Sequence, residues 1–162
     1  MSELIGKIIA LGATLFLIVV AVVVGSKVFS STTTVSEIQN LNTIVSNVRN
    51  LYANQPNYNG LTTAVAIQAG VFPSNMVQGN TAVNKWGGQV TLAQNTSNPN
   101  AFDLTYTNVP QDQCIQLVNN TQASNLVSVA VNGTTLNPPL NPGQIANACN
   151  NPTNNTITWT IR

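Results

Sequence analysis

The amino-acid sequence predicts an α+β fold, in which a long N-terminal helix packs on a small, mostly antiparallel β-sheet. Three observations support this prediction. An apolar run at the N-terminus continues as an amphipathic helical pattern, short alternating segments separated by turn signals follow, and two cysteines both lie in the later part of the chain. With 162 residues, the chain is long enough for one ordinary domain plus an extension.

The N-terminal helical pattern changes character without ending. From Ile8 to Val24 nearly every residue is apolar, and this run is long enough to cross a bilayer because about 20 residues suffice. From Val35 to Tyr52 the apolar residues recur at steps of three and four, with Asn, Ser, Thr and Gln between them. The sequence therefore predicts one helix that is apolar on all sides first and amphipathic afterwards.

This change divides the chain into two parts. We assign residues 1–27 to an apolar half of the helix that lies in a membrane or a filament core. Residues 28–162 form a globular domain that includes the amphipathic half of the helix. Bending or local melting is expected near Gly12, Gly25 and the threonines at 32–34, because glycine and β-branched residues are weak helix formers.

Turn residues end the helix at NQPNYNG, residues 54–60, and short elements follow. Alternation of apolar and polar residues marks the strands, and Pro, Gly and Asn mark the boundaries. The expected elements are a short helix in 61–72 closed by Gly70, a loop, strands in 86–94 and 101–109, a helix in 110–120, strands in 126–131 and 134–136 joined at Asn132-Gly133, a helical turn in 141–151 and a closing strand in 155–162.

Charged residues are scarce in this chain. Five Lys or Arg and four Asp or Glu give a net charge of +1, and there is no histidine. The sequence lacks the clustered cations with which a nucleic-acid binder neutralises phosphates, so we expect no nucleic-acid partner. Asp103 and Asp112 have no evident partners in the sequence, and Asp112 begins a predicted helix, where an acid suits the dipole. We expect neither enzymatic activity nor a metal or other cofactor.

The two cysteines favour a disulfide over two free thiols. Cys114 and Cys149 have a spacing that matches no familiar metal site, and there is no histidine to complete one. A disulfide between them would place the domain in an oxidising compartment. Closing a loop of this length stabilises a fold by roughly 3–4 kcal/mol in the chain-entropy model.

Two tryptophans are interpreted as packing residues. Trp86 precedes two glycines that permit a tight turn into the next strand, and its ring is expected to pack on the helix or on a neighbour. Trp159 lies in the alternating C-terminal segment and is expected in the core or at an interface.

The chain resembles a type IV pilin, and more narrowly a type IVb major pilin of the PilS kind, found in thin conjugative pili. The resemblance spans essentially the whole chain. It includes the start at Met1 with Glu3 just inside, the apolar run Ile8–Val24, and an amphipathic helix ending in LYANQPNYNG. Further on come NKWGGQVTLA, then FDLTYTNVPQDQCIQL, with Cys149 closing a C-terminal disulfide loop.

This resemblance implies how the chain is processed, held in the membrane and assembled. A prepilin peptidase would remove a leader before Met1 and commonly methylate the new amine. The subunit would wait in the bacterial inner membrane, held by its single N-terminal helix. An assembly ATPase with its platform protein would then build it into an extracellular homopolymeric filament, which leaves through an outer-membrane secretin.

Glu3 and Lys7 lie at i and i+4 with the acid nearer the N-terminus, which is the favoured order on a helix. One interpretation is a pair that snorkels to the interface of a simple membrane anchor. The resemblance favours another, in which Glu3 faces the Met1 amine of an adjoining subunit and Lys7 completes the charge network. Breaking such a buried pair is costly.

Three functions are consistent with these patterns. The first is the major subunit of an extracellular type IVb pilus that makes cell–cell contact, as in conjugation. The second is a minor pilin that acts as an adhesin. The third is a pseudopilin of a secretion system, or a plain anchored domain.

Overall fold

The computed structural model of the chain describes residues 32–121 and 125–162. Ser36–Arg162 forms one compact unit, and the description below concerns that unit. The predicted weak points at Gly12 and Gly25, and the boundary proposed at residue 27, lie outside the described residues.

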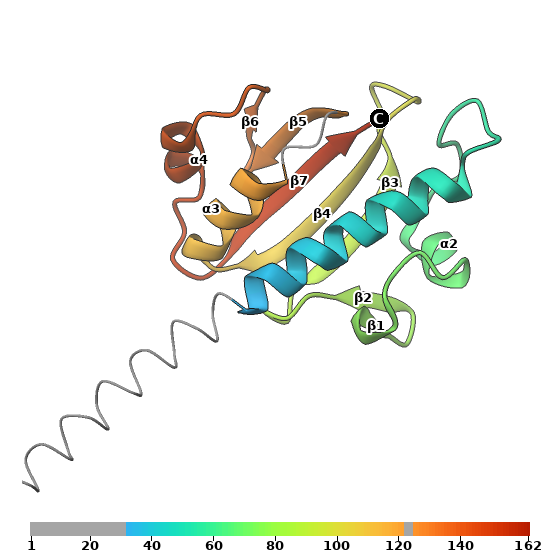
Figure 1. Ribbon diagram of the computed structural model, residues 1–162, viewed down its shortest axis with the longest axis horizontal. Coiled ribbons are helices and arrows are strands. Elements are labelled where there is room, and N and C mark those ends of the chain that lie inside the picture. The colour runs from blue at the N-terminus through green and yellow to red at the C-terminus, as the bar shows by residue number, and fades with distance from the viewer. Residues whose placement is uncertain (1–31, 122–124) are drawn as a thin grey trace, which may run out of the picture. The chain divides into compact units, whose positions relative to one another are not determined.

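A seven-stranded antiparallel sheet forms the centre of the unit (Figure 1). Its spatial order is β1-β2-β3-β4-β7-β5-β6, so the C-terminal strand lies between β4 and β5. The strands are β1 (Val77–Gln78), β2 (Thr81–Val83), β3 (Gln89–Gln94), β4 (Phe102–Val109), β5 (Leu126–Val131), β6 (Thr134–Leu136) and β7 (Asn155–Ile161).

The N-terminal helix is described from residue 32 and ends at residue 51, as its periodicity predicts. Figure 1 shows it lying across one face of the sheet. Leu41, Ile44 and Val48 form its buried stripe, at the three- and four-residue spacing that puts them on one side of a helix. At its C-terminal end, Arg49 donates from its guanidinium to the backbone oxygen of Arg162 at 3.0 and 2.6 Å.

Three short helices follow the predicted positions. Helix α2 (Thr63–Gln68) is capped by the Thr62 side chain, and α4 (Pro142–Ala148) by the Asn141 side chain. Helix α3 (Gln111–Asn120) begins after Pro110 and has Asp112 in its first turn. The caps of α2 and α4 each accept from a first-turn N–H, whereas α3 follows Pro110 without a side-chain cap.

Buried side chains from β3, β4, β5 and β7, together with those of α3, fill the face of the sheet under the helix. Trp159 and Tyr106 are fully buried and meet edge to face, with ring centroids 5.4 Å apart. The Trp159 indole N–H donates to the Thr121 hydroxyl at 2.8 Å, so the end of α3 is held over β7. The prediction that Trp159 belongs to the core is confirmed, and Trp86 packs half-buried against the same core.

The opposite face of the sheet is rich in hydroxyl groups. Thr105 of β4 and Thr158 of β7 are paired across the strands, and their hydroxyl oxygens are 2.9 Å apart. Beside them, the Asp103 carboxylate accepts from the Thr160 hydroxyl at 2.7 Å and from the Asn95 amide at 2.9 and 3.0 Å. Asp103 therefore has partners that its position in the sequence did not reveal.

The sequence-based prediction missed β1 and β2. Residues 73–85 were expected to form a loop, but they contain a 3₁₀ turn (Ser74–Met76), the edge strand β1 and its neighbour β2. These strands have two and three residues, too few to show an alternating pattern. They become strands because β2 pairs with β3 and β1 pairs with β2, and the pairing with β3 joins them to the rest of the sheet.

Two glycine positions have clear conformational reasons. In the turn between β5 and β6, Asn132 and Gly133 have φ of 50° and 84°, as the hairpin prediction requires. A Cβ atom on Gly88 would fall on the Thr107 carbonyl, so only glycine fits where β3 begins.

Candidate functional site

The residues expected to drive assembly, namely Met1, Glu3 and Lys7, lie outside the described residues. Their roles remain predictions. Within the described ranges, the features that could have a functional role are a disulfide, a buried acid on the side of the helix that faces the sheet, and small surface cavities.

The predicted disulfide between Cys114 and Cys149 is present. Both cysteines are fully buried, and their Cα atoms are 5.9 Å apart. Cys114 belongs to α3 and Cys149 directly follows α4, so the bond joins two helices that the chain separates by two strands. The covalent tie constrains a loop spanning 35 positions in the chain.

Glu37 is a fully buried acid between the helix and the sheet. The Lys85 backbone N–H donates to its Oε1 at 3.3 Å. Its Oε2 has no hydrogen-bond partner among the described residues, and the same is true of the Asn40 Nδ2 and the Tyr106 hydroxyl. The Lys85 ammonium donates instead to the Ser36 hydroxyl at 2.9 Å.

The electrostatic consequence is a raised pKa for Glu37. Burial removes water from the carboxyl group and is the dominant cause, because it penalises the charged form. The Lys85 N–H and its cation, together with the polar groups of Asn40 and Tyr106, lower the pKa but do not cancel the effect of burial. Burial, and then the neighbouring Glu37, raises the pKa of Tyr106 well above its ordinary value.

Sequence reasoning did not single out Glu37. The signal that could have found it is its place next to Ile38 in the apolar stripe of the helix, three residues after Thr34 and four before Leu41. An acid at such spacing is expected to face the core when the helix packs. The neighbour of Glu37 on β4, Tyr106, could not be found in that way, because no local pattern places Tyr106 under the helix.

A small cavity lies where the helix ends. Its volume is about 190 Å³, and its lining consists of aromatic, amide and proline side chains: Tyr52, Gln55, Pro56, Asn57, Tyr58 and Asn100. The rings of Tyr52 and Tyr58 have centroids 5.4 Å apart at an interplanar angle of 52°. None of these lining residues carries a formal charge.

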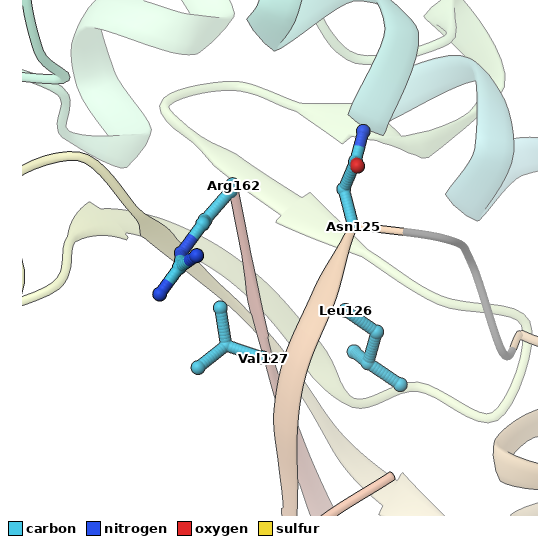
Figure 2. Close-up of a pocket in the computed structure, with 4 residues that line it drawn as sticks. All are labelled: Asn125, Leu126, Val127 and Arg162. Carbon is cyan, nitrogen blue, oxygen red and sulfur yellow. The ribbon is translucent and has the colours of Figure 1, made fainter. Parts of the chain in front are cut away.

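Another cavity, of about 290 Å³, lies beside the start of β5 and is lined by Asn125, Leu126, Val127 and Arg162. Figure 2 shows that the Leu126 and Val127 side chains leave the strand on opposite sides, and that Arg162 extends on the side of Val127. The side chains that line this cavity offer one cation and one amide beside aliphatic groups, without a second charged or aromatic side chain to orient a ligand.

Metal-binding clusters and membrane-spanning helices are both absent from the described part of the chain. No group of three or more acidic, cysteine or histidine side chains is placed to bind a metal ion there. Among the helices described, none has both the length and the hydropathy needed to cross a bilayer. The apolar run at residues 8–24 lies outside those ranges.

Comparison with solved structures identifies the class of fold. The chain is similar to the crystal structure of TcpA, a type IV pilin from Vibrio cholerae El Tor biotype, with a TM-score of 0.59 and 16% sequence identity. The match covers 81% of this chain and 99% of that one. A long helix on an antiparallel sheet with a C-terminal disulfide is thus a type IV pilin fold, as the sequence predicted.

The family is defined by the sequence itself. Residues 31–162 match the family described as PilS N terminal. The chain therefore belongs to this pilin-related family. No curated protein matches the chain.

Proposed function

We propose that the chain is the major structural subunit of an extracellular type IVb pilus that brings cells into contact, as in conjugation. The observation that supports this proposal most is the family match over residues 31–162, together with the type IV pilin fold. The near absence of charge is compatible with close packing of many copies, because few ionic groups must lose water at each contact.

In this proposal the apolar run Ile8–Val24 is used twice. It first holds the subunit in the bacterial inner membrane, and it then packs against the same run of other subunits in the filament core. A prepilin peptidase creates and methylates the Met1 amine, an assembly ATPase with its platform protein extracts the subunit, and a secretin passes the filament outward. The polymerisation itself needs no catalytic residue in the pilin.

Glu3 and Lys7 determine the register of assembly in this proposal. Glu3 pairs with the Met1 amine of another subunit, and Lys7 lies close enough to share the charge. One acid and two cations then meet in an apolar core. Removing the acid leaves two like charges in a low dielectric, which costs several kcal/mol.

The experiment compares Glu3→Ala with Lys7→Ala in cells expressing the full chain. Sheared filament is pelleted, and its yield is compared with the subunit left in the membrane fraction. We expect Glu3→Ala to be expressed and inserted normally but to form few filaments. Lys7→Ala should be affected less, because Glu3 and the amine can still pair.

Asp112→Ala is the charge-matched control, since this exposed acid lies in the described domain and its loss changes the net charge by the same amount. We expect it to leave filament yield unchanged. Normal filament yield from Glu3→Ala would contradict the pairing. If both N-terminal variants were silent and no filament formed in the wild type, a plain membrane anchor or a pseudopilin would be the better interpretation.

A minor pilin that acts as an adhesin is the second candidate. The observation that favours it is the uncharged cavity with two tyrosines at the end of the helix, since adhesion requires a recognition site. Mass spectrometry of sheared filaments distinguishes the two roles, because a major subunit is the dominant protein and a minor one is not.

A further inference from the structure

The cavity at the end of the helix is built from two segments that are distant in sequence. Tyr52 directly follows the helix, Gln55 to Tyr58 lie in the turn after it, and Asn100 belongs to the loop between β3 and β4. The backbone N–H of Tyr58 donates to the Pro99 carbonyl at 3.1 Å, which joins the two segments. The lining is therefore held by the fold on both sides.

The aromatic part of this lining is anchored in the core. The Tyr58 ring meets the buried Phe102 ring edge to face, with centroids 4.9 Å apart, and the Tyr52 ring at 5.4 Å. Both tyrosines are half-buried, so each keeps part of its ring accessible. Rings held in this way present apolar surface without losing much side-chain entropy when a ligand binds.

The polar part of the lining is uncharged and partly available. Gln55 and Asn100 are exposed, and their side-chain amides make no hydrogen bond with another described residue. Each amide can both donate and accept, and the tyrosine hydroxyls can do the same. The Asn57 side chain, in contrast, already accepts from the Asn59 N–H at 3.0 Å, which shapes the turn.

From these observations we propose that the cavity bounded by Tyr52, Tyr58 and Asn100 binds a neutral pyranose sugar. A pyranose has an apolar C–H face that packs on an aromatic ring and a rim of hydroxyls that pair with amides, so its chemistry matches the lining. The volume of about 190 Å³ is below the roughly 300–1,000 Å³ of sites for larger ligands, so a single sugar unit fits better than a longer chain. A charged ligand finds no partner in this lining.

This inference does not depend on the proposed function, since a sugar site could serve a filament subunit or a single anchored domain. A second cavity provides a comparison within the same protein. It has a volume of about 210 Å³ but no aromatic residue, and its lining includes Thr63, Asn80 and Gln89. If polar groups and size alone were sufficient, both cavities would bind sugars.

The test uses the full chain in a detergent without a sugar headgroup, because an alkyl glycoside would itself compete. Saturation-transfer NMR is recorded with the methyl α-glycosides of glucose, galactose and mannose, with N-acetylglucosamine, and with sorbitol as an acyclic polyol. We expect transfer to the ring C–H protons of at least one pyranose and not to sorbitol. Half-saturation is expected at about 1 mM, as for other small ligands.

Variants then locate the binding. Asn100→Ala and Gln55→Ala, both at exposed positions, should each raise the half-saturation concentration by roughly three- to tenfold, the effect of losing one or two hydrogen bonds. Tyr58→Ala should abolish the transfer. The matched control is Asn80→Ala in the second cavity, which should leave the signal unchanged.

Two results would overturn the proposal. One is the absence of saturation transfer above the sorbitol level for every sugar in the panel. The other is binding that both Asn100→Ala and Gln55→Ala leave within twofold of the wild type. Because these two variants change exposed side chains, the test remains valid even if Tyr58→Ala fails to fold.

Discussion

The two faces of the sheet are built by different means, and strand β7 shows the contrast most directly. Trp159 points to the face under the helix and is completely buried, whereas Thr158 and Thr160 on either side of it point to the other face. On the covered face, large side chains fill space. On the open face, short polar side chains pair with one another across the strands, as Thr105 and Thr158 do.

The two faces also treat an acid differently. Asp103, on the open face, accepts three hydrogen bonds from two neighbouring side chains. Glu37, on the covered side, accepts one from a backbone N–H and keeps an oxygen without a partner among the described residues. An acid that is well solvated by neighbouring dipoles is stable where it is, while a buried acid with few partners carries a free-energy cost.

The largest expected effect comes from Trp159→Ala on the covered face. Loss of a fully buried tryptophan should lower the free energy of unfolding by about 3–5 kcal/mol, because it leaves a cavity. Thr158→Ala is the matched control on the same strand and should cost less than about 1 kcal/mol. Urea unfolding of the full chain, followed by circular dichroism, measures both. Similar losses would contradict the contrast between the faces.

The next effect concerns the covalent tie between α3 and α4. Replacing Cys114 and Cys149 together by serine should lower the free energy of unfolding by about 3–4 kcal/mol, because the unfolded chain regains the entropy of a loop. Wild-type protein unfolded with and without a reductant provides the control and should show the same difference. An unchanged urea midpoint after reduction, with both thiols labelled, would refute this prediction.

A third test uses Glu37→Gln, which removes the charge at nearly constant shape. Above the folded-state pKa, the variant should be more stable than the wild type by about 1–3 kcal/mol, because a neutral amide avoids the cost of a buried charge. The raised pKa of Glu37 determines how its contribution to the stability of the wild type changes with pH. Folded protein holds the Glu37 proton at a higher pH than the unfolded chain does. The contribution of this group to stability is therefore fully present below about pH 4.5, the ordinary value, and is lost as pH rises through the folded-state pKa.

The free energies of unfolding of Glu37→Gln and the wild type are measured at several pH values from 4 to 8, and the difference between the two proteins is followed with pH. It should grow with pH and then level off. Glu37→Ala serves as a second variant, and it should be less stable than Glu37→Gln at every pH because it leaves the Lys85 N–H unpaired. A difference that does not change with pH would show that the carboxyl titrates equally in both states.

The smallest expected effect is that of Asp103→Asn on the open face. An amide retains one acceptor oxygen for the Thr160 hydroxyl but loses the charge-assisted bonds, so we expect a loss of about 0.5–1.5 kcal/mol. Urea unfolding at pH 7 under the conditions used for Glu37→Gln measures it. A gain in stability here would show that the acids on both faces are equally poorly solvated.

The sequence by itself determined the local elements and the class of fold. The apolar spacing of Leu41, Ile44 and Val48 predicted which side of the helix is buried, because helical periodicity is a property of the chain alone. The prolines, Gly70 and the Asn132-Gly133 turn predicted where helices and hairpins begin and end for the same reason. The spacing of the two cysteines and the absence of histidine favoured a disulfide over a metal site, and the disulfide is present.

Only the tertiary structure decided which distant segments meet. It placed β7 between β4 and β5, joined β1 and β2 to the sheet through the pairing of β2 with β3, and put Tyr106 beside Glu37. It also brought Asn100 to the tyrosines at the end of the helix. These arrangements depend on contacts between residues far apart in sequence, whose free energy comes from burial and packing in the folded state, and no local pattern carries that information.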